Sequence, residues 1–322
     1  MLAKRARLCG LLLLSIVTAA HAETPAAATV PQCQAAPLVK SADSLQSFSV
    51  SFFGDQTYQW SILLATNAHS AEPGYRFISD PWHLPVGYHA CIPVLQEAER
   101  LRSVYKRYLH AVNETHLANP GTVSNSLISL DPHRPVKVVT WMRGAQISAY
   151  KKDGDHWVTS APSDIWVTVA PNLQQFCKEY GATHSVSLAQ LTERLEQRLG
   201  LPPGAGKTDF MEIIVKDPSS PNHLFRPCSA PSVDSNTCAP GPPASAAGDS
   251  YKLWFLTQYY FSFGTAAPYS YPWTSLGYTF DWGLGDDGQL IRYGESEFVI
   301  PKGAPIQIQA IAGTREYCSM GK

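Results

Sequence analysis

The fold of this chain is decided by a stretch near its middle, DIWVTVA at residues 164–170. Every residue between Asp164 and Ala170 is β-branched or aromatic, which is typical of a buried β-strand. The segments VKVVTWM at 136–142 and FMEIIV at 210–215 have a similar apolar character. We therefore predict three strands in this part of the chain.

Helices are predicted around these strands. Residues 187–200 give the clearest one, because Ser187 opens a capping box and leucines follow at helical spacing as far as Gly200. Weaker helical patterns lie at 172–180 and at 94–112. Helices and strands therefore mix along the chain without the strict alternation that a parallel sheet requires.

The C-terminal third is strand-like in composition. A Pro, Ala, Ser and Gly-rich loop at 229–249 comes before it. Further strands are predicted at 147–150, 253–263, 277–282, 297–300 and 306–311. The expected fold class is α+β, with a small βααβ module followed by a larger, mostly antiparallel α+β domain that disulfides brace.

The first residues indicate where the protein works. Residues 1–22 combine a basic start, a short apolar run and an Ala-His-Ala pattern that ends at Ala22, which are the features of a secretory signal peptide. No other segment is long and apolar enough to predict a membrane-spanning helix. We therefore expect a periplasmic or secreted protein, cleaved near Ala22.

The rest of the chain divides into four predicted parts by composition and periodicity. They are a flexible leader at 23–36, a compact module at 37–94, a helix and linker at 95–130, and an α+β domain of unknown function at 131–322. The formal net charge is −1 with 25 Lys and Arg, so a nucleic-acid partner is not expected.

Six cysteines remain after the expected cleavage. An even number in an exported chain predicts three disulfides, and the close Cys pairs of a metal site are absent from the sequence. We expect no metal and no cofactor. Cys228 and Cys238 would close a short loop around the Pro-rich segment, which leaves Cys177 as a candidate partner for Cys318.

Two short motifs resemble active-site sequences but lack the context that those sites require. GAGKT at 204–208 looks like the end of a phosphate-binding loop, but Leu201 replaces the required first glycine and the segment follows a helix rather than a strand. GDS at 248–250 resembles the nucleophile block of a hydrolase family, but it lies in the loop-like region late in the chain. Neither motif predicts an active site.

The module at 37–94 has the order strand, helix, helix, strand. Ser44 or Asp43 can cap a first helix that Gly54 ends. Trp60, Leu63 and Leu64 lie on one side of a second helix that ends near Asn67, and a strand returns through Ile92.

The residues of this module resemble the LysM family. The resemblance is carried, in order, by ADSL at 42–45, FGD at 53–55, WSIL at 60–63, Asn67, LPVG at 84–87 and IP at 92–93. It covers about 57 of the 322 residues. LysM domains bind N-acetylglucosamine-containing glycans, chiefly peptidoglycan and chitin, in a shallow groove between two loops.

The resemblance implies a glycan-binding groove and a peptidoglycan-like partner. The contacting positions would be Ala42, Asp43, Ser44, Asn67 and Leu84. The pattern also places Cys91 on the outer side of the last strand and Cys33 just before the first, which favours a Cys33–Cys91 disulfide.

A second resemblance covers most of residues 136–318. Its blocks are DIWVTV at 164–169, LGLPP at 199–203, LFRPC at 224–228 and YPWTSLGY at 271–278. They are similar to a family of exported bacterial proteins with no assigned activity. This resemblance implies a shared fold and no particular chemistry.

Aromatic side chains are crowded at 259–282, and acids follow them closely. Such rings either fill a β core or stack on sugars. Paired carboxylates near them could act as acid and base on a glycan. The weak catalytic candidates are Asp281, Asp286, Glu295 and Glu297.

Three hypotheses follow from these patterns. The first is an exported envelope protein that binds peptidoglycan through its LysM-like module, with a larger domain that is non-catalytic or binds an envelope protein. The second is a cell-wall glycan hydrolase targeted by the module. The third is a disulfide-braced structural or interaction protein that binds no glycan.

Overall fold

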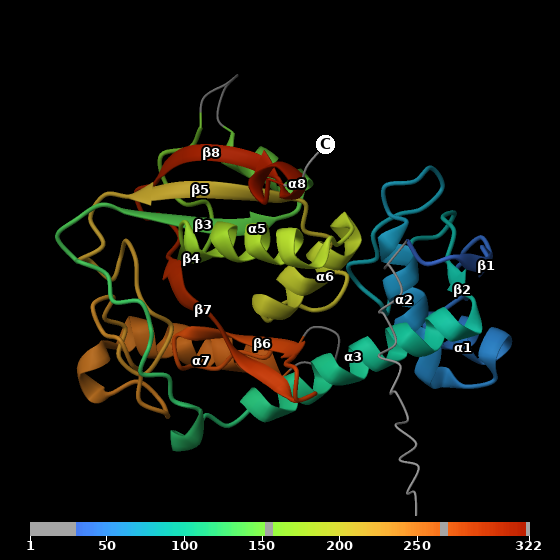
Figure 1. Cartoon of the computed structure of the whole chain (residues 1–322), viewed down its shortest axis with the longest axis horizontal. Coiled ribbons are helices and arrows are strands. Elements are labelled where there is room, and N and C mark those ends of the chain that lie inside the picture. Colours follow the sequence, from blue (N-terminus) through green and yellow to red (C-terminus); the bar gives the residue numbers. More distant parts are fainter. Residues whose placement is uncertain (1–29, 152–156, 265–269, 320–322) are drawn as a thin grey trace, which may run out of the picture.

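In the computed structural model the chain has two parts joined by one long helix (Figure 1). The structure describes residues 30–151, 157–264 and 270–319. The predicted signal peptide lies outside these ranges. The small N-terminal part lies on the right of Figure 1, and a six-stranded sheet with its helices forms the larger part on the left.

The small part contains two short strands and two helices. Its elements are β1 (Cys33–Ala35), α1 (Leu45–Phe53), a 3-10 turn (Gln56–Tyr58), α2 (Gln59–Ala68) and β2 (Ile92–Pro93). Ser44 caps α1 and Gly54 ends it in a left-handed conformation, as predicted. β1 and β2 are antiparallel. Because β1 falls within the segment expected to be a flexible leader, the ordered module starts earlier than predicted.

The helix α3 (Leu95–Thr115) joins the two parts. Its apolar side meets α2 at one end and β6 (Tyr278–Leu284) at the other. Tyr108 is fully buried on α3, where its ring meets the indole of Trp282 edge to face. Its hydroxyl donates a hydrogen bond of 2.6 Å to the carbonyl of Ser270. A shared core therefore holds the small part against the sheet.

The large sheet is antiparallel at every pairing, which confirms the predicted fold class. The strand order is β6-β7-β4-β3-β5-β8. Besides β6, its strands are β3 (Val136–Met142), β4 (Ile165–Val169), β5 (Asp209–Val215), β7 (Leu290–Ile300) and β8 (Gln307–Gly313).

The helices of the larger part are α4 (Gly144–Ile147), α5 (Asn172–His184), α6 (Leu188–Arg198), α7 (Asp249–Phe263) and α8 (Thr314–Tyr317). Three 3-10 turns complete the list, at Pro120–Thr122, Ser148–Tyr150 and Ser245–Ala247. No helix among the described residues is long and apolar enough to cross a membrane.

Alternate residues of the strands face two different cores. Val138, Val167 and Phe298 pack on the side that loops cover. Val139, Trp141 and Phe210 face the other side, where α5 and α6 lie. Across the strands on this helix side, Val139 is opposite Thr168, and Thr168 is opposite Glu297. Thr168 and Glu297 therefore form a polar pair on this face of the sheet, next to the apolar Val139.

Three sequence predictions about elements are wrong. Residues 253–263 belong to α7, because Phe255 and Ser262 are buried on one helix side while Leu253 and Leu256 are exposed. Residues 147–150 are helical turns rather than a strand beside β3. The helix α5 continues through Gly181 to His184.

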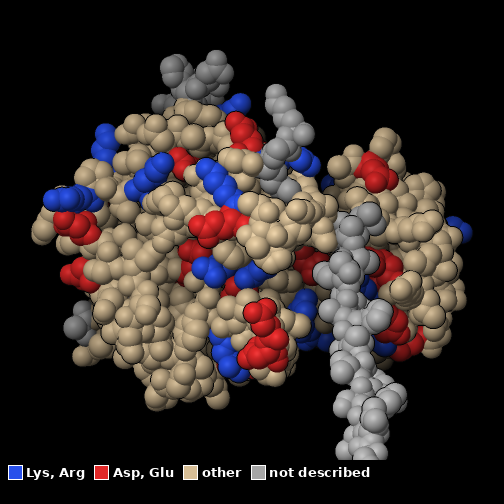
Figure 2. Space-filling view, in the orientation of Figure 1, with Lys and Arg blue, Asp and Glu red and all other residues tan. Residues whose placement is uncertain are grey.

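The structure contains the three predicted disulfides. They join Cys33 to Cys91, Cys177 to Cys318 and Cys228 to Cys238. The second ties α5 to the residue that follows α8, across 141 positions of sequence. Acidic and basic side chains are interspersed on the face seen in Figure 2, which gives no support to a nucleic-acid surface.

Candidate functional site

A cavity of about 1010 Å³ lies on the helix side of the sheet, over β3, β4 and β7. Leu173 of α5 and the turn after α6 line it, as do Gln258 and Phe261 of α7 and residues 271–273. Its volume is at the upper end of the range for small-molecule sites. The polar side chains of its lining include those of Thr140, Gln146, Ser163, Asp164, Thr168, Lys207, Gln258, Thr279 and Glu297.

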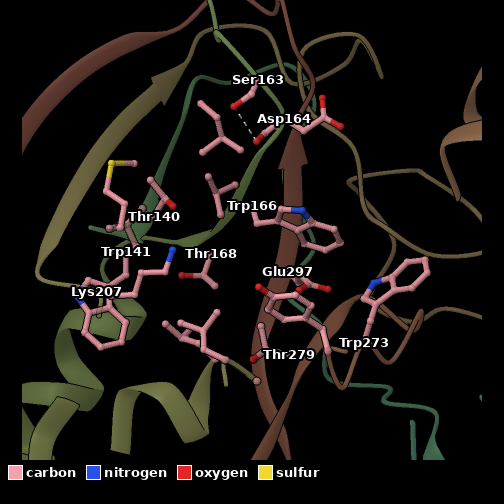
Figure 3. Close-up of a pocket in the computed structure, with 18 of the residues that line it drawn as sticks. Thr140, Trp141, Ser163, Asp164, Trp166, Thr168, Lys207, Trp273, Thr279 and Glu297 are labelled. Carbon is pink, nitrogen blue, oxygen red and sulfur yellow. Dashed lines mark hydrogen bonds between the residues drawn. The ribbon is translucent and has the colours of Figure 1, made fainter. Parts of the chain in front are cut away.

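Three residues that line this cavity each have a buried polar atom with no hydrogen-bond partner among the described residues. They are Oγ1 of Thr168, Nε1 of Trp273 and Oε2 of Glu297. In Figure 3, Glu297 lies below Trp166 and to the left of Trp273, with Thr168 on its other side. Because buried polar groups are nearly always paired, three unpaired atoms in one cavity indicate a place for a ligand or ordered water.

Glu297 is the acid of the cavity. Glu297 is 9% exposed. Burial raises the pKa of its carboxyl to about 8, although the charge of the nearby Arg226 lowers it. At neutral pH the carboxyl therefore keeps its proton. It then donates a hydrogen bond as well as accepting one.

Lys207 is the base of the cavity. Burial, and secondly the charge of Arg143, lower the pKa of its amine to about 8. In Figure 3 the amine points toward Thr168, on the side opposite Glu297. No carboxylate of the described residues lies within ion-pair distance of it.

The loop that carries Lys207 is held by buried contacts. Both carboxylate oxygens of Glu196 on α6 accept backbone hydrogen bonds, from Gly204 at 3.0 Å and from Ala205 at 2.7 Å. Burial raises the pKa of Glu196 to about 8, and these two hydrogen bonds oppose that shift. On the other side, Nε of Arg143 donates to the carbonyl of Ala205 at 3.0 Å.

A residue of the small part reaches the same loop. Gly206 has a φ of +66°, and a Cβ there would lie 2.6 Å from the Phe77 ring, so only glycine fits. The Phe77 ring also lies under the Arg143 guanidinium, at 4.0 Å from its centroid. The segment between α2 and β2 therefore supports one side of the cavity.

Indole rings form the opposite wall. Trp166 and Trp273 meet edge to face at 6.3 Å, and Trp254 contacts both rings. Nε1 of Trp254 donates to the Asp164 carboxylate at 2.8 Å, which fixes that ring. A rigid wall of this kind offers flat apolar faces at little entropic cost.

The four acids predicted as catalytic candidates lie in different environments. Asp281 is fully buried but accepts two hydrogen bonds from Arg194, at 2.9 and 2.7 Å. Glu295 accepts one from Arg198 at 2.8 Å. Asp286 is exposed in the turn between β6 and β7. Only Glu297 lines the cavity.

The aromatic stretch at 259–282 is divided between the cavity and the core. Phe261, Tyr271, Trp273 and Phe280 line the cavity. Trp282 is fully buried against α3 instead, and its Nε1 donates to the carbonyl of Leu201. The stretch therefore supplies rings to the cavity wall as well as to the core.

The five predicted glycan-binding residues lie in the small part. Asn67 is 9% exposed, and its amide makes two hydrogen bonds to the backbone of Ile78, at 2.7 and 3.2 Å. Its polar atoms are therefore used to hold the segment at 68–80. Leu84 packs against the core that contains Ile78.

The other three positions lie in the loop before α1. Ala42 is exposed, the Asp43 carboxylate accepts from the Lys40 amide, and Ser44 caps the helix. Just before this loop, the Val39 amide donates to the carbonyl of Tyr88 at 2.8 Å, and the Val39 carbonyl accepts from the Gly87 amide at 3.0 Å, so the loop lies beside the turn at Gly87. Four of the predicted positions thus lie on two neighbouring loops, while Asn67 is engaged elsewhere.

One cluster has the composition of a metal site. The ligand atoms of Cys33, His69 and Cys91 all lie within 4.8 Å of one another. Both sulfurs belong to one disulfide, however, and His69 also bonds to the carbonyl of Pro31 and to Glu72. The cluster is therefore explained by the disulfide and its polar neighbours.

Sequence reasoning missed Lys207, Thr168 and Trp166 as cavity residues. Lys207 was visible as the basic residue of a glycine-rich loop, but its setting depends on the distant Glu196. Thr168 was visible as a polar residue in an apolar strand. Neither signal predicts a site until the sheet brings these strands together.

Comparisons with known proteins add nothing to this geometry. No family model, curated protein or solved structure matches the chain. The similarity of residues 37–94 to LysM domains therefore depends on their sequence blocks alone.

Proposed function

We propose that this is an exported cell-envelope protein that binds an amino-sugar glycan and takes part of it into the cavity of the sheet domain. The observation that carries the proposal is the set of three unpaired buried atoms, on Thr168, Trp273 and Glu297, around one aromatic-walled cavity. A ligand with several oxygens would satisfy all three.

A sugar fits both kinds of surface in this cavity. Its apolar ring faces stack on indoles, and its hydroxyl and acetamido oxygens take hydrogen bonds. Trp166 and Trp273 supply the rings. Thr168, Trp273 and the protonated Glu297 supply donors.

The module at 37–94 is proposed to contact peptidoglycan as well. Its βααβ order and its two adjacent loops support a LysM-like groove at Ala42, Asp43, Ser44 and Leu84. Asn67 would hold the groove wall rather than touch glycan. The three disulfides and the signal-like first 22 residues support a periplasmic or secreted location.

Binding is favoured over hydrolysis because of the acids present. A glycosidase of the usual kind needs two carboxyl groups at the scissile bond. Among the described residues, Glu297 and Asp164 are the only acids that line the cavity, and the Asp164 oxygens accept from Trp254 and from the Lys302 amide. A hydrolase therefore remains the second hypothesis, with Glu297 as its acid.

The experiment is sedimentation of the mature protein with insoluble peptidoglycan, together with calorimetry on soluble fragments. Thr168→Val and Glu297→Met remove hydrogen-bonding groups while preserving much of the side-chain volume. Each should weaken binding about three- to tenfold. Glu297→Gln keeps a donor and an acceptor and should bind as the wild type does.

Matched controls change similar groups elsewhere. Thr257→Val and Asp286→Asn lie at exposed positions and should leave binding unchanged. Asp43→Ala tests the module groove separately. Equal binding by wild type, Thr168→Val and Glu297→Met would remove the cavity from the proposal. Release of glycan fragments by wild type but not by Glu297→Gln would establish the hydrolase instead.

A further inference from the structure

Lys207 brings a charge into the cavity that the glycan proposal does not require. Its amine lines the cavity, and none of the described acids forms an ion pair with it. Lys207 is half-buried, and a cation partly removed from water is costly unless a counter-ion pairs with it. The cost is visible in the lowered pKa of the amine.

The surrounding structure builds this position. The carboxylate of Glu196 accepts the amides of Gly204 and Ala205 and so shapes the turn that ends at Lys207. Phe77 fills the space beside Gly206. Two separate parts of the molecule therefore hold the loop in place.

The charged neighbours do not neutralise the amine. Arg143 repels it, and Glu196 attracts it. The two oxygens of Glu196 are already used by backbone amides. Lys207 therefore has donors available to a molecule in the cavity.

The four polar groups of the cavity together offer more donors than acceptors of hydrogen bonds. Nε1 of Trp273 and the amine of Lys207 can only donate. The protonated Glu297 and the hydroxyl of Thr168 can donate or accept. A ligand that satisfies all four must offer mainly acceptor oxygens, and a neutral one would leave the amine without a counter-charge.

We infer that the cavity selects an amino sugar that bears a carboxylate, with this carboxylate on Lys207 and the sugar's neutral oxygens on Thr168, Trp273 and Glu297. This inference rests on the proposed glycan-binding function. It narrows the ligand from glycans in general to acidic ones.

The test compares two ligands of similar shape, one with a negatively charged carboxylate and one with a neutral carboxamide in its place. N-acetylmuramic acid and its carboxamide are titrated into the full mature protein by calorimetry at pH 6.5. Wild type should bind the acid about tenfold or more tightly than the amide, because a charge-assisted hydrogen bond replaces a neutral one. Lys207→Met should bind both ligands equally.

A matched control is Lys178→Met, which removes the same charge from an exposed position on α5. It should keep the preference for the acid. Circular dichroism should show that Lys207→Met remains folded, because the change removes a desolvated charge.

The possible results distinguish a failure of the acidic-ligand inference from a failure of the glycan-binding proposal. Equal binding of acid and amide by wild type would overturn the acidic-ligand inference, yet loss of both in Thr168→Val would keep the glycan function. A preference that survives in Lys207→Met would assign the carboxylate to another residue and also overturn the inference. Failure of both ligands to bind would overturn both statements.

Discussion

Two neighbouring regions on the β6–β7 hairpin bury carboxyl groups in opposite ways. Between α6 and the hairpin, Asp281 and Glu295 are each paired with arginines of α6. Two residues further along β7, Glu297 lines the cavity, and its Oε2 has no hydrogen-bond partner among the residues that the structure describes. In the first region, arginines of the chain pair with both carboxyl groups. In the second region, one carboxyl oxygen has no partner among the described residues.

This difference separates structural acids from binding ones. All three side chains are at most 9% exposed, so burial alone does not distinguish them. The presence of a partner does. A buried group that the chain satisfies contributes to folding, and a buried group that it leaves unsatisfied indicates a ligand.

The largest expected effect comes from breaking the paired region. Asp281→Asn would leave Arg194 buried without a full counter-charge, so we expect a loss of about 3–5 kcal/mol in unfolding free energy. Urea denaturation measures it, with Asp286→Asn as the exposed control. A loss no larger than that of the control would remove the distinction between the two regions.

A smaller effect extends the comparison to the module. Asn67→Ala would leave the Ile78 amide and carbonyl without partners, because Asn67 bonds to both. We expect a loss of about 1–3 kcal/mol in unfolding free energy. Asp43→Ala, at a more open loop position, is the control. If Asn67→Ala stayed as stable as wild type yet lost peptidoglycan binding, Asn67 would be a contact residue after all.

A pH-dependent effect concerns the unpaired region. In the folded chain, burial raises the pKa of the Glu297 carboxyl to about 8, whereas its ordinary value is 4.5. The stability from this proton is complete below pH 4.5 and is lost as the pH rises through 8. Glu297→Gln removes this dependence.

The measurement is thermal or urea unfolding of wild type and Glu297→Gln across this pH window. Relative to wild type, the variant should gain about 3–4 kcal/mol between pH 5 and pH 8, because each pKa unit is about 1.4 kcal/mol. The difference between the two proteins cancels the contribution of Glu196, whose pKa is raised in the same direction. A constant difference across the window would mean that Glu297 is ionised in the fold.

Much of the fold was predictable because local patterns were strong. The strands at 136–142 and 164–170 and the Ser187-capped helix lie where apolar composition and capping placed them. Residues 253–263 were assigned wrongly, because a short aromatic segment suits a strand or a helix equally well. Only its packing shows that Phe255 faces inward and Leu256 faces out.

The site was predictable only in part. Glu297 was among the four candidate acids, and Trp273 belonged to the aromatic stretch, but their free atoms depend on which partners lie nearby. Nothing in the local sequence tells Asp281, which is paired, from Glu297, which is not. The arginines of α6 that pair with Asp281 and Glu295 lie about 90 positions earlier in the chain. Such pairing is a property of the tertiary structure.

The contact between Phe77 and Gly206 has a practical consequence for how the chain can be divided. Phe77 belongs to the small part, and it supports both Gly206 and Arg143 next to the cavity. Removing residues 30–94 would therefore take away one side of a site that lies more than 40 residues further along the sequence. The two parts look like separable modules in sequence, but anyone who expresses the sheet domain alone would be studying an incomplete receptor.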